Sequence, residues 1–162
     1  IFFSLIVIIF ALSQVGCGGE GEQVHEHSHA EGENHHHEPH YHEPPHGGAG
    51  VTLGNEDAHI EFLADAEEGT VTAWFFKPHM EQYLRMELES FEVLVKRSEG
   101  ETQLVFEALA NPGTGETVGN TSQFVANAER LGKAETFDAV IPEITVLGKT
   151  YNNLEFNYPK GN

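Results

Sequence analysis

Cysteine is almost missing from this sequence, which has one cysteine, Cys17, among 162 residues. A single thiol excludes an internal disulfide framework, and it also excludes zinc or iron–sulfur sites that need several cysteines. The position of Cys17 is therefore the only informative thing about it.

Basic residues are scarce as well, with 8 Lys and Arg against 26 Asp and Glu, which gives a formal net charge of −18. Nucleic-acid phosphates and anionic lipid surfaces repel such a chain, so we expect no nucleic-acid partner. The same charge attracts cations, although an ordinary solvated surface can have this composition too. Charge alone identifies no ligand.

Long apolar runs are limited to the first 12 residues, which are uncharged. A helix that crosses a bilayer needs about 20 apolar residues, so this run is too short to span one. It has the length of the apolar part of an export signal. We interpret residues 1–16 as a signal peptide, and because no basic start is present we expect further residues ahead of Ile1.

Small residues precede Cys17, and two glycines follow it. This arrangement resembles the lipobox of bacterial lipoproteins, in which the cysteine is acylated and becomes the mature N-terminus. The family prefers Leu three residues before the cysteine, where this chain has Gln14, whereas Val15 and Gly16 fit the motif. The resemblance implies a lipid anchor on Cys17 in a membrane of the cell envelope, facing the periplasm or the exterior. An ordinary signal peptide cleaved nearby is the alternative.

Residues 18–46 contain many glutamates, almost no aliphatic residues, and neither Lys nor Arg. Such a segment cannot bury a core, so we predict that residues 17–46 form a disordered tether. Imidazoles and carboxylates suit zinc, copper(II), nickel and cobalt, and the lack of sulfur disfavours copper(I). The candidate metal ligands of the tether are His25, His27, His29, His35, His36, His37, His40, His42 and His46.

The spacing of these histidines supports chelation. His25, His27 and His29 alternate with other residues, so an extended backbone puts their rings on one side. The ion would have to order the chain as it binds, and we therefore expect moderate affinity and poor selectivity. A plain hydrophilic spacer is the alternative. An expression tag is disfavoured, because these histidines are mixed with Glu and Pro.

From Gly47 onward, short apolar or alternating runs are separated by clusters of Gly, Pro, Asn and Asp, which is the pattern of strands and turns. Long amphipathic helices are missing, which disfavours an α/β fold. We predict that residues 47–162 form an all-β domain, an antiparallel β-sandwich of the Ig-like or Greek-key type. The expected strands are 51–53, 59–63, 70–76, 85–87, 91–96, 103–109, 122–125, 137–141, 144–147 and 154–158, with a short helix over 128–134 after Asn127.

The apolar positions of these runs predict the core. Its expected members are Ile60, Phe62, Val71, Trp74, Phe76, Leu88, Val93, Val95, Leu104, Phe106, Phe124, Phe137, Val140, Ile144, Val146, Leu154 and Phe156. We interpret the aromatic residues as packing rather than as a ligand platform.

His59 and Glu61 alternate with apolar neighbours, which puts both on the opposite face of their strand. His46 stands before two glycines that permit a sharp turn, so His46, His59 and Glu61 could meet in a structured metal site. Exposed His and Glu on a polar strand face are the ordinary alternative. We expect His79 to lie in a loop beside Met80, whose thioether suits copper but more often fills a hydrophobic gap.

The lipobox-like start, the His-rich stretch, Pro45-His46-Gly47-Gly48 and His59-Ile60-Glu61 together resemble small bacterial envelope lipoproteins and the periplasmic segments of heavy-metal efflux adaptors. The resemblance implies metal handling outside the cytoplasm, with a metal transporter or efflux component as a possible partner. It implies no catalytic role.

The sequence shows no nucleophile with a base, no phosphate-binding glycine loop and no helical zinc motif, so we expect a protein that is not an enzyme. The leading hypothesis is a cell-envelope lipoprotein that binds zinc or copper for buffering, scavenging or delivery to a transporter. The alternative is a lipid-anchored β-sandwich that binds a protein or glycan, with the tether acting only as a spacer.

Overall fold

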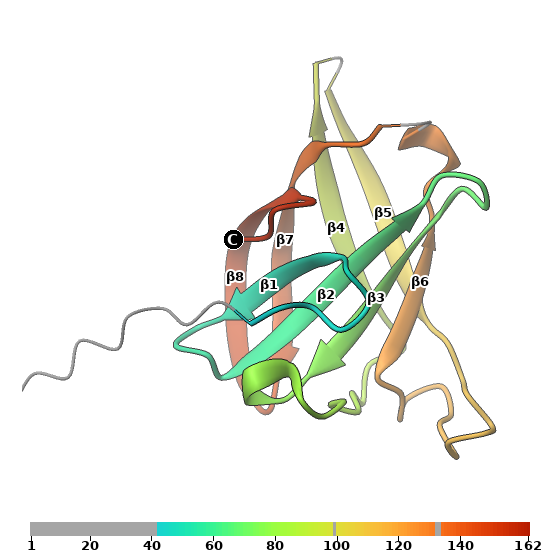
Figure 1. The fold of residues 1–162 in the computed structure, drawn as a ribbon, viewed down its shortest axis with the longest axis vertical. Helices are drawn as coiled ribbons and strands as arrows, with labels where there is room; N and C mark the ends of the chain where they lie inside the picture. The colour runs from blue at the N-terminus through green and yellow to red at the C-terminus, as the bar shows by residue number, and fades with distance from the viewer. Residues whose placement is uncertain (1–41, 99, 132–133) are drawn as a thin grey trace, which may run out of the picture. The chain divides into compact units, whose positions relative to one another are not determined.

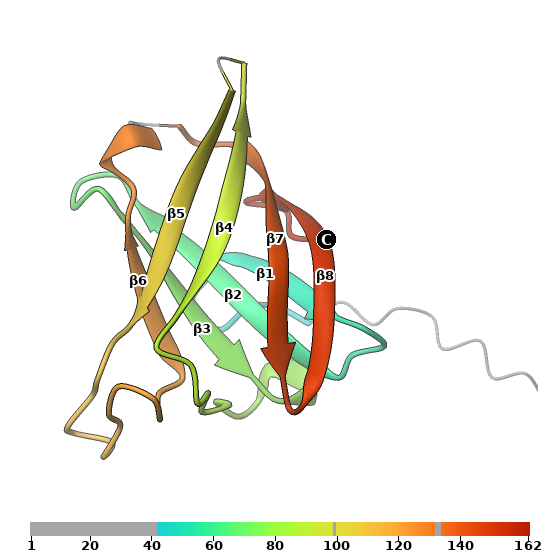
Figure 2. The same cartoon turned by 180° about the vertical axis from the view of Figure 1, so that it is seen from behind.

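The computed structural model describes residues 42–98, 100–131 and 134–162. Eight antiparallel strands form one sheet, which curls until its two edges nearly meet, so the domain is a nearly closed barrel (Figure 1, Figure 2). No helix in the described part of the chain has the length and apolar character needed to cross a membrane. The strands are β1 (Ala49–Leu53), β2 (Ala58–Asp65), β3 (Thr70–Phe76), β4 (Ser90–Arg97), β5 (Gly100–Ala108), β6 (Gln123–Asn127), β7 (Phe137–Val146) and β8 (Lys149–Tyr158).

The all-β, antiparallel class is confirmed, but the expected division into two stacked sheets is not what the structure has. The spatial order β1-β2-β3-β6-β5-β4-β7-β8 is one sheet in which each strand is hydrogen-bonded to the next. Strands with one inward face show the same alternation in a sandwich and in a barrel. The sequence pattern therefore could not distinguish the two.

The C-terminal residues help to close the barrel beside β1. The side chain of Asn162 accepts a hydrogen bond from the Thr52 amide at 2.8 Å and donates one to the Thr52 carbonyl at 3.2 Å. Gly161 has a φ of 85°, and a Cβ there would lie 2.0 Å from the Gly50 carbonyl oxygen. Only glycine lets the chain end approach β1 so closely.

The predicted strands 137–141 and 144–147 are a single strand, β7, which continues through Pro142. Proline lacks the amide that a ladder needs. The register with β8 pairs Ile141 with Leu154 and Glu143 with Asn152, passing over Pro142. Ala139 and Ile141 are buried before this point and Ile144 after it, so the inward alternation shifts by one residue.

Two other predicted elements are shorter than expected. Residues 85–87 do not form a strand, and Met86 makes only an isolated bridge to Thr121. Of the helix predicted over 128–134, the described residues contain one 3-10 turn, η2 (Glu129–Leu131), and residues 132–133 lie outside the described ranges. Asn127 does cap it, because its side-chain oxygen accepts a hydrogen bond from the Glu129 amide at 3.2 Å.

Most of the predicted core is buried inside the barrel, and Leu88, Phe137 and Leu154 pack against it while partly exposed. Three members differ from the prediction. Trp74 is half-buried and Phe76 is buried, but both lie on the outer face of β3, since they pair with Glu61 and His59 of β2. Val140 is half-buried, because its neighbours in β7 point inward instead. The inward residues that the prediction missed include Val51, Leu53, Phe75, Phe91 and Ile141.

The outer face of β2 and β3 is covered by residues 42–48, which we call the strap (Figure 1). A turn reverses the strap, with the Gly47 amide donating to the Pro44 carbonyl at 3.0 Å and a φ of 76° at Gly47. The strap then passes so close to β2 that a Cβ on Gly48 would lie 2.3 Å from the Phe62 carbonyl oxygen. The sharp turn expected at the two glycines is therefore present.

Candidate metal centre

Glu61 fastens the strap to the barrel. Its side chain is completely buried. One carboxylate oxygen accepts hydrogen bonds from the amides of His46 and Gly48, both at 2.8 Å, and the other accepts from His46 Nδ1 at 2.7 Å. A buried carboxylate is tolerated when donors surround it in this way. The three bonds thus hold the middle of the strap on the outer face of β2.

The ring of His46 is held on its other sides too. It stacks on the Trp74 indole, with the centroids 3.9 Å apart and the planes 16° apart. Its Nε2 is hydrogen-bonded to the Tyr83 hydroxyl at 3.1 Å. His46 and Glu61 do meet, as the sequence suggested, but as a hydrogen-bonded anchor.

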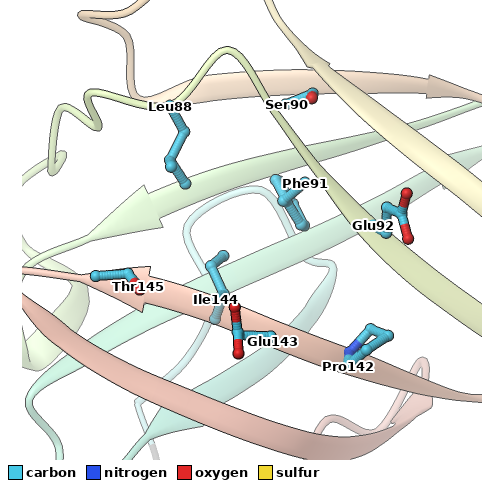
Figure 3. Close-up of a pocket in the computed structure, with 8 residues that line it drawn as sticks. All are labelled: Leu88, Ser90, Phe91, Glu92, Pro142, Glu143, Ile144 and Thr145. Atoms are coloured by element: carbon cyan, nitrogen blue, oxygen red, sulfur yellow. The ribbon is translucent and has the colours of Figure 1, made fainter.

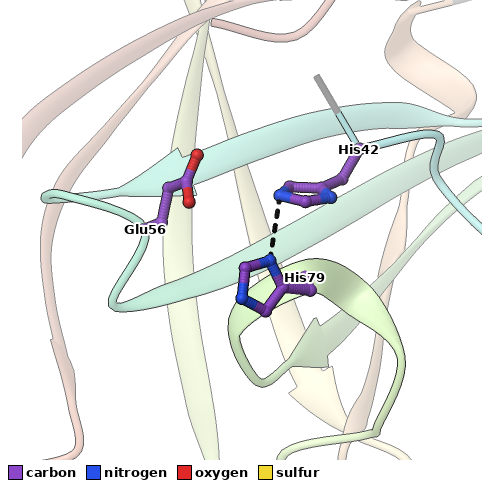
Figure 4. Close-up of side chains that lie close together, drawn as sticks. All are labelled: His42, Glu56 and His79. Carbon is purple, nitrogen blue, oxygen red and sulfur yellow. Dashed lines mark hydrogen bonds between the residues drawn. The ribbon is translucent and has the colours of Figure 1, made fainter. Parts of the chain in front are cut away.

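The group of possible metal ligands lies beside this anchor and consists of His42, Glu56 and His79. Their ligand atoms all lie within 4.8 Å of one another. His42 belongs to the strap, Glu56 to the turn between β1 and β2, and His79 to the 3-10 turn η1 (Pro78–Met80) (Figure 4). Three separate elements therefore bring two imidazoles and one carboxylate to a common point that could hold a metal ion.

The spacing of the two imidazoles suits such an ion. His42 Nε2 and His79 Nδ1 are hydrogen-bonded to each other at 3.3 Å, so a metal ion would replace the shared proton (Figure 4). In tetrahedral coordination with Zn–N bonds of about 2.0–2.1 Å, two ligand nitrogens are separated by about 3.3–3.4 Å. Both nitrogens therefore already have the separation that a shared tetrahedral ion requires.

The backbone at Glu56 and His79 is unusual. Their φ angles are 62° and 66°, in the left-handed region that residues other than glycine seldom adopt. Each such conformation costs on the order of 1–3 kcal/mol, and such positions concentrate at functional sites. The surrounding fold must therefore hold the backbones of Glu56 and His79 in this costly conformation.

Asp57 holds the turn that carries Glu56. Its carboxylate accepts hydrogen bonds from Lys149 Nζ at 2.5 Å and from the Tyr151 hydroxyl at 2.7 Å, both on β8. These hydrogen bonds, that from Lys149 first, lower the pKa of Asp57 below its ordinary value. The Asp57 carboxylate is hydrogen-bonded to β8, so the carboxylate of this turn that lies near the histidines is that of Glu56.

His59 lies beside His42 on the outer face of β2, outside the group whose ligand atoms fall within 4.8 Å of one another. Its side chain is 3 % exposed, and its Nε2 has no hydrogen-bond partner among the described residues. The ring centroid is 5.5 Å from that of His42, with the planes 74° apart. Burial, followed by the charges of His42 and His79, lowers the pKa of His59, while Glu56 opposes the shift. His59 is thus kept in the neutral form that binds metals.

The buried Nε2 of His59 is energetically costly as it stands. An unsatisfied buried polar atom costs about 1–3 kcal/mol. His59 and Glu61 occupy the face opposite the core, as the alternation predicts, but the strap buries both. His46, His59 and Glu61 do not converge as one ligand group, because His59 faces His42 and Glu61 is taken up by His46.

The remaining candidates have different outcomes. His79 belongs to the ligand group, whereas Met80 is buried, which agrees with its interpretation as a hydrophobic plug. Glu56 was missed, because one more acidic residue in a turn gives no signal in the sequence. Cys17 and seven tether histidines lie outside the described residues, namely His25, His27, His29, His35, His36, His37 and His40.

A second concavity lies where β4 and β7 diverge. These strands pair only from Leu94 to Lys96, opposite Val140 to Asp138, and they separate beyond that point (Figure 2). The opening, of about 370 Å³, has apolar residues such as Phe91 and Ile144 and the carboxylates of Glu92 and Glu143 on its walls (Figure 3). It contains no histidine and does not contribute to the metal group.

Comparisons with protein-family models, with curated proteins and with solved structures give no match to this chain. The functional argument therefore rests on the residues and their geometry.

Proposed function

We propose that this protein is a cell-envelope lipoprotein that binds a divalent transition metal, zinc or copper(II), for buffering or for delivery to a transporter. The observation that carries the proposal is the convergence of His42, Glu56 and His79 within 4.8 Å. Imidazole and carboxylate are the ligand types that suit these ions. In this proposal the lipid on Cys17 anchors the protein, and the barrel holds the ion outside the cytoplasm.

The tether and the barrel have different roles in this proposal. The tether histidines that precede His42 collect ions weakly, because binding must order the chain. The barrel site binds more tightly, because Glu61 and Asp57 already hold two of its three elements. The net charge of −18 raises the local concentration of cations around both. An ion can then pass from the tether to the barrel at His42, where the two regions join.

A zinc titration of the full chain by calorimetry separates the two regions. The parent chain is compared with a variant in which the seven histidines from His25 to His40 are replaced by Gln. We expect several ions per parent chain, and a single tighter site in the variant. Loss of all binding in the variant would mean that the barrel has no site, and binding by neither protein would refute the proposal. A protein or glycan partner for the barrel surface would then be the better hypothesis.

A further inference from the structure

His59 is the one buried imidazole near the metal group that belongs to a barrel strand. Its Nε2 is enclosed and has no hydrogen-bond partner in the described ranges. A buried histidine that only fills space would be expected to bond through both ring nitrogens to nearby groups. The ring instead lies edge-to-face with His42, whose Nε2 is already 3.3 Å from His79.

We infer that His59 is the fourth ligand of the metal centre, and that the centre selects a tetrahedral ion of the zinc class. This inference rests on the proposed function. The ligand atoms of His42, Glu56 and His79 already converge, and when His42 and His79 close toward the ring of His59 the set becomes three imidazoles and one carboxylate, which suits tetrahedral Zn²⁺. Such a set leaves no position for a reacting water, so the centre holds its ion instead of using it for hydrolysis.

One distance favours a tetrahedral ion over square-planar copper(II). Neighbouring nitrogens of a square-planar ion with bonds of about 2.0–2.1 Å would be about 2.9 Å apart, shorter than the 3.3 Å found between His42 and His79.

The histidines of the centre also differ in burial. His59 is fixed in β2 and buried, whereas His42 is on the strap and His79 is exposed. We therefore expect His59 to stay in place while His42 and His79 close over the ion from outside. Metal exchange then requires movement at the exposed side.

Nitrogen NMR of the histidine rings tests the inference without substituting His59. The full chain is used with the seven histidines from His25 to His40 replaced by Gln, which leaves His42, His46, His59 and His79. On addition of Zn²⁺ we expect the ligating nitrogens of His42, His59 and His79 to move to metal-bound shifts. His46 is the internal control, because Glu61 and Tyr83 already engage its two nitrogens.

Each outcome decides between the two proposals. Shifts at all three histidines support the inference, whereas shifts at His42 and His79 with none at His59 would overturn it and leave the metal site standing. No shift at any ring would overturn both.

Cobalt(II) provides a second readout. The chain with the seven tether substitutions should give the intense visible absorption of four-coordinate cobalt(II). A further His59→Gln substitution should give the weak absorption of a higher-coordinate, water-bound ion. Zinc affinity should fall by about 100-fold or more, because loss of an outer-sphere partner alone costs 10–100-fold. An unchanged spectrum and affinity in a folded His59→Gln variant would rule out His59 as a ligand.

Discussion

The imidazole of His46 lies flat on the indole of Trp74, with the ring centroids 3.9 Å apart. Trp74 is the only tryptophan in the chain, so its emission reports on one place, the contact between strap and barrel. Undocking of the strap would expose the indole to water and shift its emission to longer wavelength. This natural probe makes the anchor beside the metal centre measurable.

Glu61→Ala should release the strap. Two part-buried amides, of His46 and Gly48, would lose their acceptor, at about 1–3 kcal/mol each. We therefore expect a red-shifted Trp74 emission and a lower free energy of unfolding by about 3 kcal/mol in urea denaturation. Glu67→Ala, at an exposed turn position, is the matched control. Native-like emission and stability in the Glu61→Ala protein would show that the anchor does not hold the strap.

The sequence predicted which polar residues lie on the outer face of β2, but it did not predict that the strap covers them. Period-two alternation put His59 and Glu61 on the outer face of β2, and their pairing with the outer face of β3 confirms this. Alternation cannot show that residues 42–48 return over that face. The strap depends on the buried carboxylate of Glu61. The two amides that donate to it, of His46 and Gly48, lie 15 and 13 positions earlier in the sequence. The predicted core failed at Trp74 and Phe76 for the same reason, because the strap packs on them from outside.

The metal group was predictable only in part. His42 was a candidate because of the composition of the tether, and His79 because it is one of the few histidines of the domain. Glu56 had no distinguishing signal, since its place depends on a left-handed turn and on Asp57 reaching across to β8. Composition can reveal ligand types, but convergence of three elements requires the closed sheet.

Asp57→Asn should weaken zinc binding without removing a ligand. The change weakens the bonds to Lys149 and Tyr151 that hold the turn of Glu56. Loss of outer partners typically costs 10–100-fold in metal affinity, and we expect about tenfold here. Competition with a zinc chelator gives the affinity. Lys96→Met, which removes an exposed ion pair with Glu155 elsewhere on the barrel, should leave it unchanged. If the Asp57→Asn protein bound zinc as tightly as the parent, the hydrogen bonds of Asp57 to β8 would not be needed to position Glu56.

Glu116 should contribute to the acid sensitivity of the fold. Burial acts to raise its pKa, but hydrogen bonds from Ser122 and Thr114, with the charge of Arg85, outweigh it and lower the pKa below the ordinary 4.5. A lowered folded-state pKa means that this stabilisation is complete above about pH 4.5 and is lost as the pH falls through the folded value.

Unfolding in urea between pH 7 and pH 3 measures this contribution. Glu116→Gln should be less stable than the parent at pH 7, and the difference should shrink toward pH 3. Glu107→Gln, at an exposed position of β5, should lie close to the parent curve throughout. A difference for Glu116→Gln that is constant with pH would show that its carboxylate does not titrate with folding.

The design of the metal experiments follows from the strap. A truncation that begins at residue 48 would remove His42 and His46 together and leave the buried Glu61 carboxylate without its donors. With such a truncation, a loss of metal binding could not be distinguished from a loss of the folded strap. Substituting the histidines from His25 to His40 in the full chain leaves the strap and barrel unchanged.

The most direct test of the metal centre is the zinc affinity of that substituted chain with and without His79→Asn. Asn tolerates the left-handed backbone at this position, so the change removes the imidazole with little strain. Glu81→Gln, an exposed carboxylate next to η1, is the control for charge alone. We predict one zinc ion bound at micromolar affinity or tighter, kept in the Glu81→Gln protein and lost in the His79→Asn protein. Equal binding by all three proteins would contradict a metal centre at His42, Glu56 and His79.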